Sequence, residues 1–225
     1  MFALVASRCH KASLGLVAIF SRPFASKMSN SYDKYIEDII HYWFKPDHVP
    51  WFGSKEADQE IREKYGGLVV AADEGKLDSW KEEPRASLAL ILVCDQVCRG
   101  VNKGTNKMNF LDAIALELSH KFIEQKTHNH LDFTMFQRAF IYMPFEHSEN
   151  HGNQEISVKM FAQLVEDAKT PEERKVGETF LMYAKNHKEV IDKFGRYPQR
   201  NAFLGRESTP EEKEFLANLP SKYKW

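Results

Sequence analysis

His147, Glu149 and His151 occur at every second position in the stretch YMPFEHSENHGNQE, residues 142–155. Imidazole and carboxylate groups exchange protons near neutral pH, so His147 and Glu149 are candidate catalytic residues. An extended turn would place all three side chains on one side, as metal binding requires. No second set of ligands with recognisable spacing occurs elsewhere in the chain, and we therefore predict no metal site here.

The same stretch also has a purely structural explanation. Pro144 lacks a backbone N–H donor and is expected to end a helix, and Asn150 or Asn153 can cap the next one. His147 and Glu149 would then lie on a connecting turn, where capping and packing account for them without chemistry. Both explanations stay open from the sequence.

A second polar group interrupts the most apolar segment of the chain. Asp95, Gln96 and Arg99 lie in PRASLALILVCDQVCRG, residues 84–100. Asp95 and Arg99 are four residues apart and can meet on one helix face. A charge among buried apolar side chains must be paired with an opposite charge or serve a function. These residues are therefore either a structural ion pair or part of a pocket wall that binds a ligand.

Three arginines follow in the loop FGRYPQRNAFLGRESTP, residues 194–210. Arg196, Arg200 and Arg206 would repel one another unless acids or an anionic ligand neutralised them, and guanidinium groups bind carboxylate or phosphate in bidentate geometry. The loop is expected either to bind an anion or to pair with acids of the same chain. The candidate internal partners are Asp95, Glu149 and Glu207.

The elements that must position these residues are helices. Apolar residues recur at helical spacing, and Thr170, Pro171 and Glu173 combine an N-cap, a first-turn proline and a capping-box acid. The same combination recurs at Thr209, Pro210 and Glu212. The expected helices cover residues 32–44, 56–75, 84–100, 109–125, 131–143, 153–169, 171–194 and 210–219. No run of alternating β-branched residues competes with them. The sequence predicts an all-α domain of about eight antiparallel helices, with residues 84–100 buried at the centre.

The composition limits the class of protein. The chain has 225 residues, 43% hydrophobic and 28% charged, and its net charge is −1. This near-neutral balance argues against a nucleic-acid partner, which needs a basic face. Cys94 and Cys98 share one helix face and are expected to be buried, reduced thiols. The chain lacks GxGxxG, Walker and GxSxG motifs, so no cofactor is predicted.

The first 30 residues differ from the rest. They contain no acidic residue before Asp33, and Arg22 lies three residues before a plausible cut after Phe24. This composition is typical of a mitochondrial transit peptide, and the alternatives are a dispensable, disordered tail and a secretory signal. The expected location is the mitochondrial matrix, or the cytosol if synthesis starts at Met28. The apolar run is too short to span a membrane, and residues 31–225 are expected to form a single helical domain.

Taken together, the motifs YWF…WFG, DQVCRG…GT, YMPFEHSE…Q and FGRYPQRNAFLGRESTPEE resemble the family called domain of unknown function 924. The resemblance covers about residues 33–218 and implies an all-helical, tetratricopeptide-like fold, but no particular reaction. The family usually has Phe, Pro and Asn at the positions of Val97, Cys98 and Gly100, and His at that of Gln199. The residues that match the family's motifs are Asp95, Gln96, Arg99, His147, Ser148, Glu149, Arg196, Arg200, Asn201 and Arg206.

Two functions of different classes fit these observations. In the first, the motifs converge on a cleft for a small anionic metabolite. His147 and Glu149 would be the acid/base pair for hydrolytic or lyase chemistry, and Asp95 would orient them. The ligand-binding candidates are Asp95, Gln96, Arg99, Arg196, Arg200, Asn201 and Arg206. In the second, the motifs are structural, and tetratricopeptide-like helices bind a peptide or protein partner.

Overall fold

The computed structural model describes residues 30–45 and 55–223, whose regular secondary structure is entirely helical. The α-helices are α1 (Lys34–Phe44), α2 (Lys55–Asp73), α3 (Pro84–Ile91), α4 (Cys98–Val101), α5 (Asp112–Ile123), α6 (Met135–Glu146), α7 (His151–Glu166), α8 (Pro171–Phe194) and α9 (Pro210–Ala217). Shorter helical segments are η2 (Asp78–Glu82), η3 (Leu92–Val97), η4 (His130–Asp132), η5 (Pro198–Arg200) and η6 (Ser221–Tyr223). Because α3, η3 and α4 form one continuous run, the described residues make eight α-helices, and the predicted fold class is confirmed.

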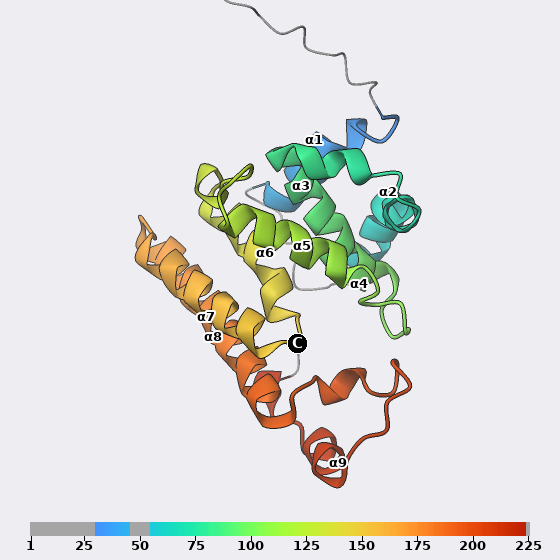
Figure 1. Ribbon diagram of the computed structural model, residues 1–225, viewed down its shortest axis with the longest axis vertical. Helices are drawn as coiled ribbons and strands as arrows, with labels where there is room; N and C mark the ends of the chain where they lie inside the picture. Colours follow the sequence, from blue (N-terminus) through green and yellow to red (C-terminus); the bar gives the residue numbers. More distant parts are fainter. Residues whose placement is uncertain (1–29, 46–54, 224–225) are drawn as a thin grey trace, which may run out of the picture.

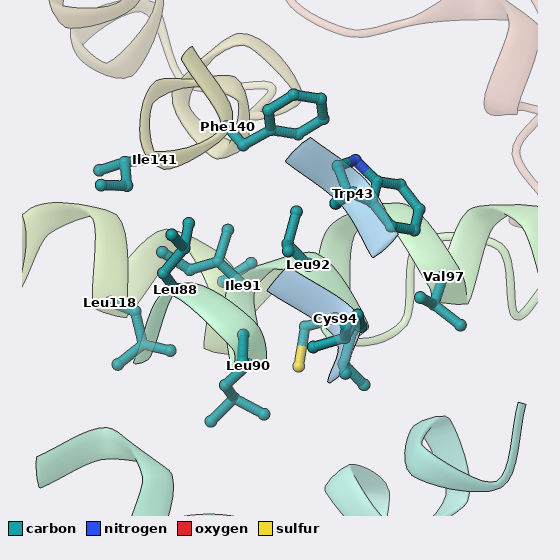
Figure 2. Close-up of a cluster of buried hydrophobic side chains, with 14 of the residues drawn as sticks. Trp43, Leu88, Leu90, Ile91, Leu92, Cys94, Val97, Leu118, Phe140 and Ile141 are labelled. Carbon is teal, nitrogen blue, oxygen red and sulfur yellow. The ribbon is translucent and has the colours of Figure 1, made fainter. Parts of the chain in front are cut away.

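The continuous run α3–η3–α4 is the centre of the hydrophobic core. Its apolar side chains contact those of α1, α5 and α6, and Figure 2 shows Trp43 and Phe140 approaching it from two other helices. The Trp43 and Phe140 rings meet edge to face, with centroids 6.2 Å apart. Cys94 and Cys98 are free and buried here, as the sequence predicts. Burial raises the pKa of both thiols, which keeps them protonated at neutral pH.

The middle of this run is a π-helical turn, η3, which the sequence did not predict. The N–H of Cys98 bonds to the carbonyl of Val93, five residues earlier, so the turn is wider than in an α-helix. Asp95 lies within this turn and is 1% exposed. The π turn therefore brings a carboxylate into the most apolar part of the molecule.

Helix α6 runs through Pro144, so the prediction that this proline ends the helix is wrong. Thr134 and Gln137 form a capping box at its start, and it continues to Glu146. Pro144 lies in the last turn, where the missing N–H costs one hydrogen bond, and the residues around it are buried against α5 and α7. His147 rather than Pro144 is the C-cap.

Helices α7 and α8 form an antiparallel pair that lies along one edge of the molecule, side by side (Figure 1). The side chain of Asn150, one of the two candidate caps, caps α7, and that of Thr170 caps α8 as predicted from the sequence. Helix α8 ends at Gly195, whose φ of 68° is the left-handed conformation that glycine adopts readily. This sharp end directs the following loop back toward α6. We call this loop, which carries Arg196, Arg200 and Arg206, the arginine loop.

The segment after α8 packs on a second, smaller hydrophobic cluster. Val190, Ile191 and Tyr197 are buried there, with Phe194 and Phe215 packed against them. A capping box between Thr209 and Glu212 starts α9, as its sequence predicts. The second cluster thus anchors the arginine loop between α8 and α9.

The described residues do not test several of the predictions. The proposed transit peptide, including the alternative start at Met28, lies outside the described residues apart from Asn30. The tetratricopeptide-like arrangement and the single-domain boundary stay predictions. No helix in the described part of the chain is long and apolar enough to cross a membrane.

Candidate functional site

Asp95 is the centre of a buried polar network. Its Oδ1 lies 2.6 Å from Nδ1 of His147 and 3.4 Å from the guanidinium of Arg99, and Gln96 donates to Oδ2. Burial alone would raise the pKa of Asp95, but His147 and Arg99 outweigh it and hold the pKa below its ordinary value. Asp95 is therefore ionised at neutral pH, and the predicted pair with Arg99 is present.

His147 is held in one orientation by this carboxylate. An ionised carboxylate only accepts hydrogen bonds, so Nδ1 of His147 donates to Asp95, and Nε2 is the ring nitrogen left to exchange a proton. The side chain is 16% exposed. A rigid imidazole with a free Nε2 is the arrangement that proton transfer requires.

Arg99 joins this pair to a second carboxylate that the sequence did not indicate. Its guanidinium donates to both oxygens of Asp112, at 2.8 Å each. Burial raises the pKa of Asp112 despite the nearby Arg99. Asp112 is the first residue of α5, so Arg99 connects the central helical run to that helix.

The arginine loop is largely neutralised by acids of the same chain. Arg206 binds Glu149 in bidentate geometry, at 2.6 and 3.0 Å, which is one of the pairings expected from the sequence. Arg196 instead binds Glu212, at 2.7 and 2.8 Å, and donates to the backbone carbonyl of Glu207 rather than to its carboxylate. Two of the three arginines are therefore paired inside the fold.

Arg200 is paired less closely. It donates to the backbone carbonyl of His147 at 2.9 Å, and its guanidinium lies over the ring of Tyr197. Its nearest carboxylate oxygen is Oδ2 of Asp112, at 3.8 Å. Burial and the neighbouring Arg99 lower the pKa of Arg200, which is the direction expected for an incompletely compensated cation.

A cavity of about 240 Å³ lies beside this polar network. Three predicted site residues line it, namely His147, Glu149 and Arg200. The other lining residues are Asn109, Asp112, Ala113, Leu116, Pro144, Ser148 and Leu204. The cavity is smaller than the usual range of roughly 300–1,000 Å³ for sites of drug-sized ligands, so it suits a small molecule.

The remaining predicted residues lie outside the cavity wall. Asp95 contacts His147, and Arg99 donates to Asp112, so each holds a lining residue in place without lining the cavity itself. Gln96 donates to Asp95. Arg196 and Asn201 contact Glu212 on α9 instead, with Asn201 Nδ2 at 3.1 Å from that carboxylate. The three motifs thus converge, but not all of their residues face the same space.

The pairing within the first motif differs from the predicted one. His147 contacts Asp95 rather than Glu149, and Glu149 accepts from Arg206 and from the backbone N–H of Tyr197. His151 is exposed on α7, where its Nδ1 lies 3.3 Å from Asp192. His147, Glu149 and His151 consequently do not meet at one point, so the alternating pattern builds no metal site.

Glu146 and His187 are two buried residues near His147 that were not predicted from the sequence. Nδ1 of His187 lies 2.9 Å from the carbonyl of Tyr183 and 3.0 Å from Oε1 of Glu146. Burial raises the pKa of Glu146 to about 8 and lowers the pKa of His187 well below its ordinary value. Both groups are therefore mainly neutral at pH 7, and their contact is not an ion pair.

Glu146, His147 and His187 are also near enough to hold a metal ion, because one ligand atom of each lies within 4.8 Å of the others. Two imidazoles and a carboxylate form a common donor set for transition metals. The set would first have to release the Glu146 proton, and Arg99 and Arg200 would oppose a divalent cation nearby. Proton transfer fits the existing hydrogen bonds better than metal binding does.

Several buried polar atoms around the network have no hydrogen-bond partner among the described residues. They are Nε of Arg99, Nε of Arg206, Oδ1 of Asn201 and both amide atoms of Gln199. A buried polar group without a partner costs free energy, so native structures satisfy most of them with protein, water or ligand. Four of these five atoms belong to residues 199–206 of the arginine loop, and the fifth belongs to Arg99 in the network.

The histidines at positions 128 and 130 lie in the core. A solvated polar loop is the default explanation for HNH in a turn, but both rings are buried. His128 contacts the hydroxyl of Ser87, and His130 contacts that of Tyr142. Both are core histidines with hydrogen-bond partners, and neither lines the cavity.

Comparison with known proteins identifies relatives of unknown function. A solved structure of a protein of unknown function from Agrobacterium tumefaciens matches with a TM-score of 0.69 and 28% sequence identity, covering 83% of this chain and 99% of that one. No curated protein is significantly similar to the chain. The family model described as "Bacterial protein of unknown function (DUF924)" matches residues 39–219. The chain therefore belongs to the DUF924 family.

Proposed function

We propose that the cavity binds a small anionic molecule and that His147 transfers protons to or from it. The contact that carries this proposal is the 2.6 Å hydrogen bond between Nδ1 of His147 and the buried Asp95. It fixes the tautomer and orientation of an imidazole that lines a cavity. Asp95 acts as a positioning residue, because it touches His147 and does not line the cavity.

The cavity also holds the cation that such a ligand needs. Arg200 lines the cavity, and its nearest carboxylate is 3.8 Å away. A ligand carboxylate or phosphate would complete its charge, while Nε2 of His147 would act on a neighbouring bond as a general base or acid. Hydrolysis and elimination are the reaction classes that a single positioned base of this kind serves.

The alternative is a protein-interaction module in which the polar motifs are structural. The ion pairs Arg206–Glu149 and Arg196–Glu212 favour it, because both satisfy arginines inside the fold. In that case the network stabilises the helices, and a peptide or protein partner binds another surface. A small-molecule binding experiment distinguishes the two functions.

The test combines binding with turnover. A panel of small carboxylates and phosphates should stabilise the wild-type protein in a thermal-shift assay, and NMR should then follow conversion of the compounds that bind. His147→Gln should keep binding but lower conversion roughly 10²–10⁴-fold, the usual contribution of a general base. Asp95→Asn should lower conversion and shift its pH profile, which a merely structural role would not do.

His151→Gln is the matched control, since His151 is an exposed imidazole on the following helix. It should behave as the wild type in both assays. If no small anion stabilises the wild-type protein, the proposal fails, and the result favours the protein-interaction module. If anions bind but none is converted, the acid/base part of the proposal fails.

A further inference from the structure

The charged side chains in and beside the cavity wall balance one another. Three carboxylates lie with three guanidinium groups there, namely Asp95, Asp112 and Glu149 with Arg99, Arg200 and Arg206. An anionic group that entered alone would bind less tightly, because it would leave an excess negative charge in a partly buried site. The balance is kept when the ligand brings a cationic group together with its anionic group.

Arg99 is shared between two of these carboxylates. Its Nη2 donates to both oxygens of Asp112 at 2.8 Å and lies 3.4 Å from Oδ1 of Asp95. Glu149, the other carboxylate in the cavity lining, accepts two hydrogen bonds from Arg206, at 2.6 and 3.0 Å. Asp112 is therefore the lining carboxylate whose charge is less completely compensated.

Arg200 lies near Asp112 without binding it directly. Its Nη1 is 3.8 Å from Oδ2 of Asp112, which is beyond hydrogen-bonding distance, and both side chains line the cavity. Its Nη2 donates to the backbone carbonyl of His147, which holds the guanidinium in place. The wall thus presents a positive and a negative group side by side, and neither is hydrogen-bonded to the other.

The pKa shifts of these two groups support the same interpretation. Burial raises the pKa of Asp112, and burial together with Arg99 lowers the pKa of Arg200, so neighbouring charges compensate neither group completely. A ligand ammonium group beside Asp112 and a ligand carboxylate beside Arg200 would each favour the charged form of its neighbour.

We infer that the ligand is an α-amino acid, whose carboxylate binds Arg200 and whose ammonium group binds Asp112. An α-amino acid carries both charged groups on one carbon atom, which matches two wall groups whose nearest atoms are 3.8 Å apart. The inference rests on the proposed function, because Arg200 still binds the anionic group, and it narrows that function to one class of ligand. Molecules whose charges lie far apart, such as ω-amino acids, would satisfy one wall group and not the other.

The side chain of the amino acid would meet the apolar part of the lining. Leu116 is four residues after Asp112 on α5, so the two lie on the same helix face, and both line the cavity. Pro144 and Leu204 lie in the lining as well, and Leu204 is 41% exposed. A ligand that covers Leu204 removes apolar surface from water, which favours binding. An aliphatic side chain is therefore the most suitable one for a probe.

Norvaline is such a probe, and three analogues each change one feature of it. Valerate lacks the ammonium group, butylamine lacks the carboxylate, and δ-aminovalerate is an isomer whose charges lie at opposite ends of the chain. Ligand-observed NMR titrations of the wild-type protein at neutral pH should show norvaline binding at least tenfold more tightly than each analogue, which corresponds to roughly 1.4 kcal/mol. Because these comparisons use the unchanged protein, they decide the inference even where a variant fails to fold.

Variants of the protein locate the two charged groups of the ligand. Arg200→Gln should weaken the binding of both norvaline and valerate, by at least tenfold for norvaline. Asp112→Asn should weaken norvaline binding at least tenfold and leave valerate binding unchanged or tighter, so that the preference for norvaline disappears. Arg174→Gln and Glu178→Gln neutralise an exposed arginine and an exposed acid on α8, and they should change neither affinity.

The outcomes separate the inference from the function on which it rests. If valerate binds as tightly as norvaline and Arg200→Gln abolishes both, the proposed anion site stands while the inference is wrong. If butylamine or δ-aminovalerate binds as tightly as norvaline, or if Asp112→Asn keeps the preference for norvaline, the inference is wrong as well. If neither norvaline nor valerate nor any anion of the thermal-shift panel binds the wild-type protein, the proposed function fails together with the inference.

Discussion

Glu146 shows what the fold does to a single residue. Its carboxyl group is 6% exposed and contacts His187, a neutral imidazole. Burial, with a smaller contribution from Asp95, raises its pKa from 4.5 to about 8. Between these two pH values the folded protein keeps a proton that the unfolded chain releases. Stability from this group is therefore complete below pH 4.5 and is lost as the pH rises toward 8.

Glu146→Gln should remove this pH dependence, because Gln has nearly the same shape and stays neutral over this pH range. The variant should match the wild type near pH 5 and exceed it at pH 8–9, by on the order of 3 kcal/mol. Urea unfolding at several pH values measures the difference. Glu155→Gln, an exposed acid on α7, should show no such trend, and a constant offset for Glu146→Gln at every pH would contradict the assignment.

Some residue-scale contacts were predictable and others were not. Asp95 and Arg99 are four apart in an apolar helix, so their pairing follows from local geometry and the cost of burying a charge. His187 gave no such signal, because an imidazole in a helix with many charged residues looks solvated. Its burial depends on how α8 packs against α6, and a single sequence does not encode that packing in any local pattern.

Glycines at two helix interiors show how packing decides the effect of the same substitution. Gly67 in α2 has open space where a Cβ would lie. Gly177 in α8 faces α7, and its Cβ would lie 3.2 Å from Cγ2 of Val165 and 3.0 Å from the flexible end of Met135. Close packing of α7 on α8 therefore depends on Gly177.

Gly67→Ala should stabilise the protein by about 1 kcal/mol, the difference in helix propensity between the two residues. Gly177→Ala should give less or none of this gain, because Val165 must shift by a few tenths of an ångström. Gly177→Leu should destabilise by about 3 kcal/mol or more. Urea denaturation of the three variants tests the contrast, and an equal gain from alanine at both positions would show that α7 and α8 do not pack tightly at Gly177.

At the scale of elements, the sequence predicted where most helices start better than how they continue. Thr170 and Thr209 cap helices by local hydrogen bonds, so their motifs suffice. Pro144 was misjudged because burial against neighbouring helices holds the last turn of α6 together. The π turn of η3 was also missed, since apolar periodicity does not distinguish a turn with one extra residue from an α-helix.

Across the whole molecule, the polar network links two hydrophobic clusters. The large cluster centres on α3 and η3, and the small one lies between α8, the arginine loop and the C-terminal segment. Figure 1 shows α9 at the opposite end of the molecule from α1. The all-α class was predictable because helical periodicity runs through the whole chain. The convergence of three distant motifs was predictable only as a hypothesis, because it depends on distances between segments.

Glu149 is the residue through which the arginine loop is held to the turn between α6 and α7. It accepts from Arg206 at 2.6 and 3.0 Å and from the backbone N–H of Tyr197 at 2.9 Å. Burial would raise its pKa, but Arg206 and the Tyr197 N–H outweigh burial, and the pKa lies below the ordinary value. The stabilisation is therefore present above pH 4.5 and is lost as the pH falls through the lowered pKa.

Glu149→Gln should keep an acceptor for Tyr197 but leave the charge of Arg206 uncompensated, at a cost of about 2 kcal/mol in this partly buried setting. Hydrogen exchange should quicken mainly in residues 197–217, where the small cluster packs, and much less in residues 86–97 of the central core. Glu178→Gln, an exposed acid on α8, is the control and should leave both segments unchanged. The gap in stability between the wild type and Glu149→Gln should close at acid pH, because the wild-type carboxylate is then protonated as well. Equal acceleration in both segments would mean that the two clusters unfold as one unit and that Glu149 does not hold the loop separately.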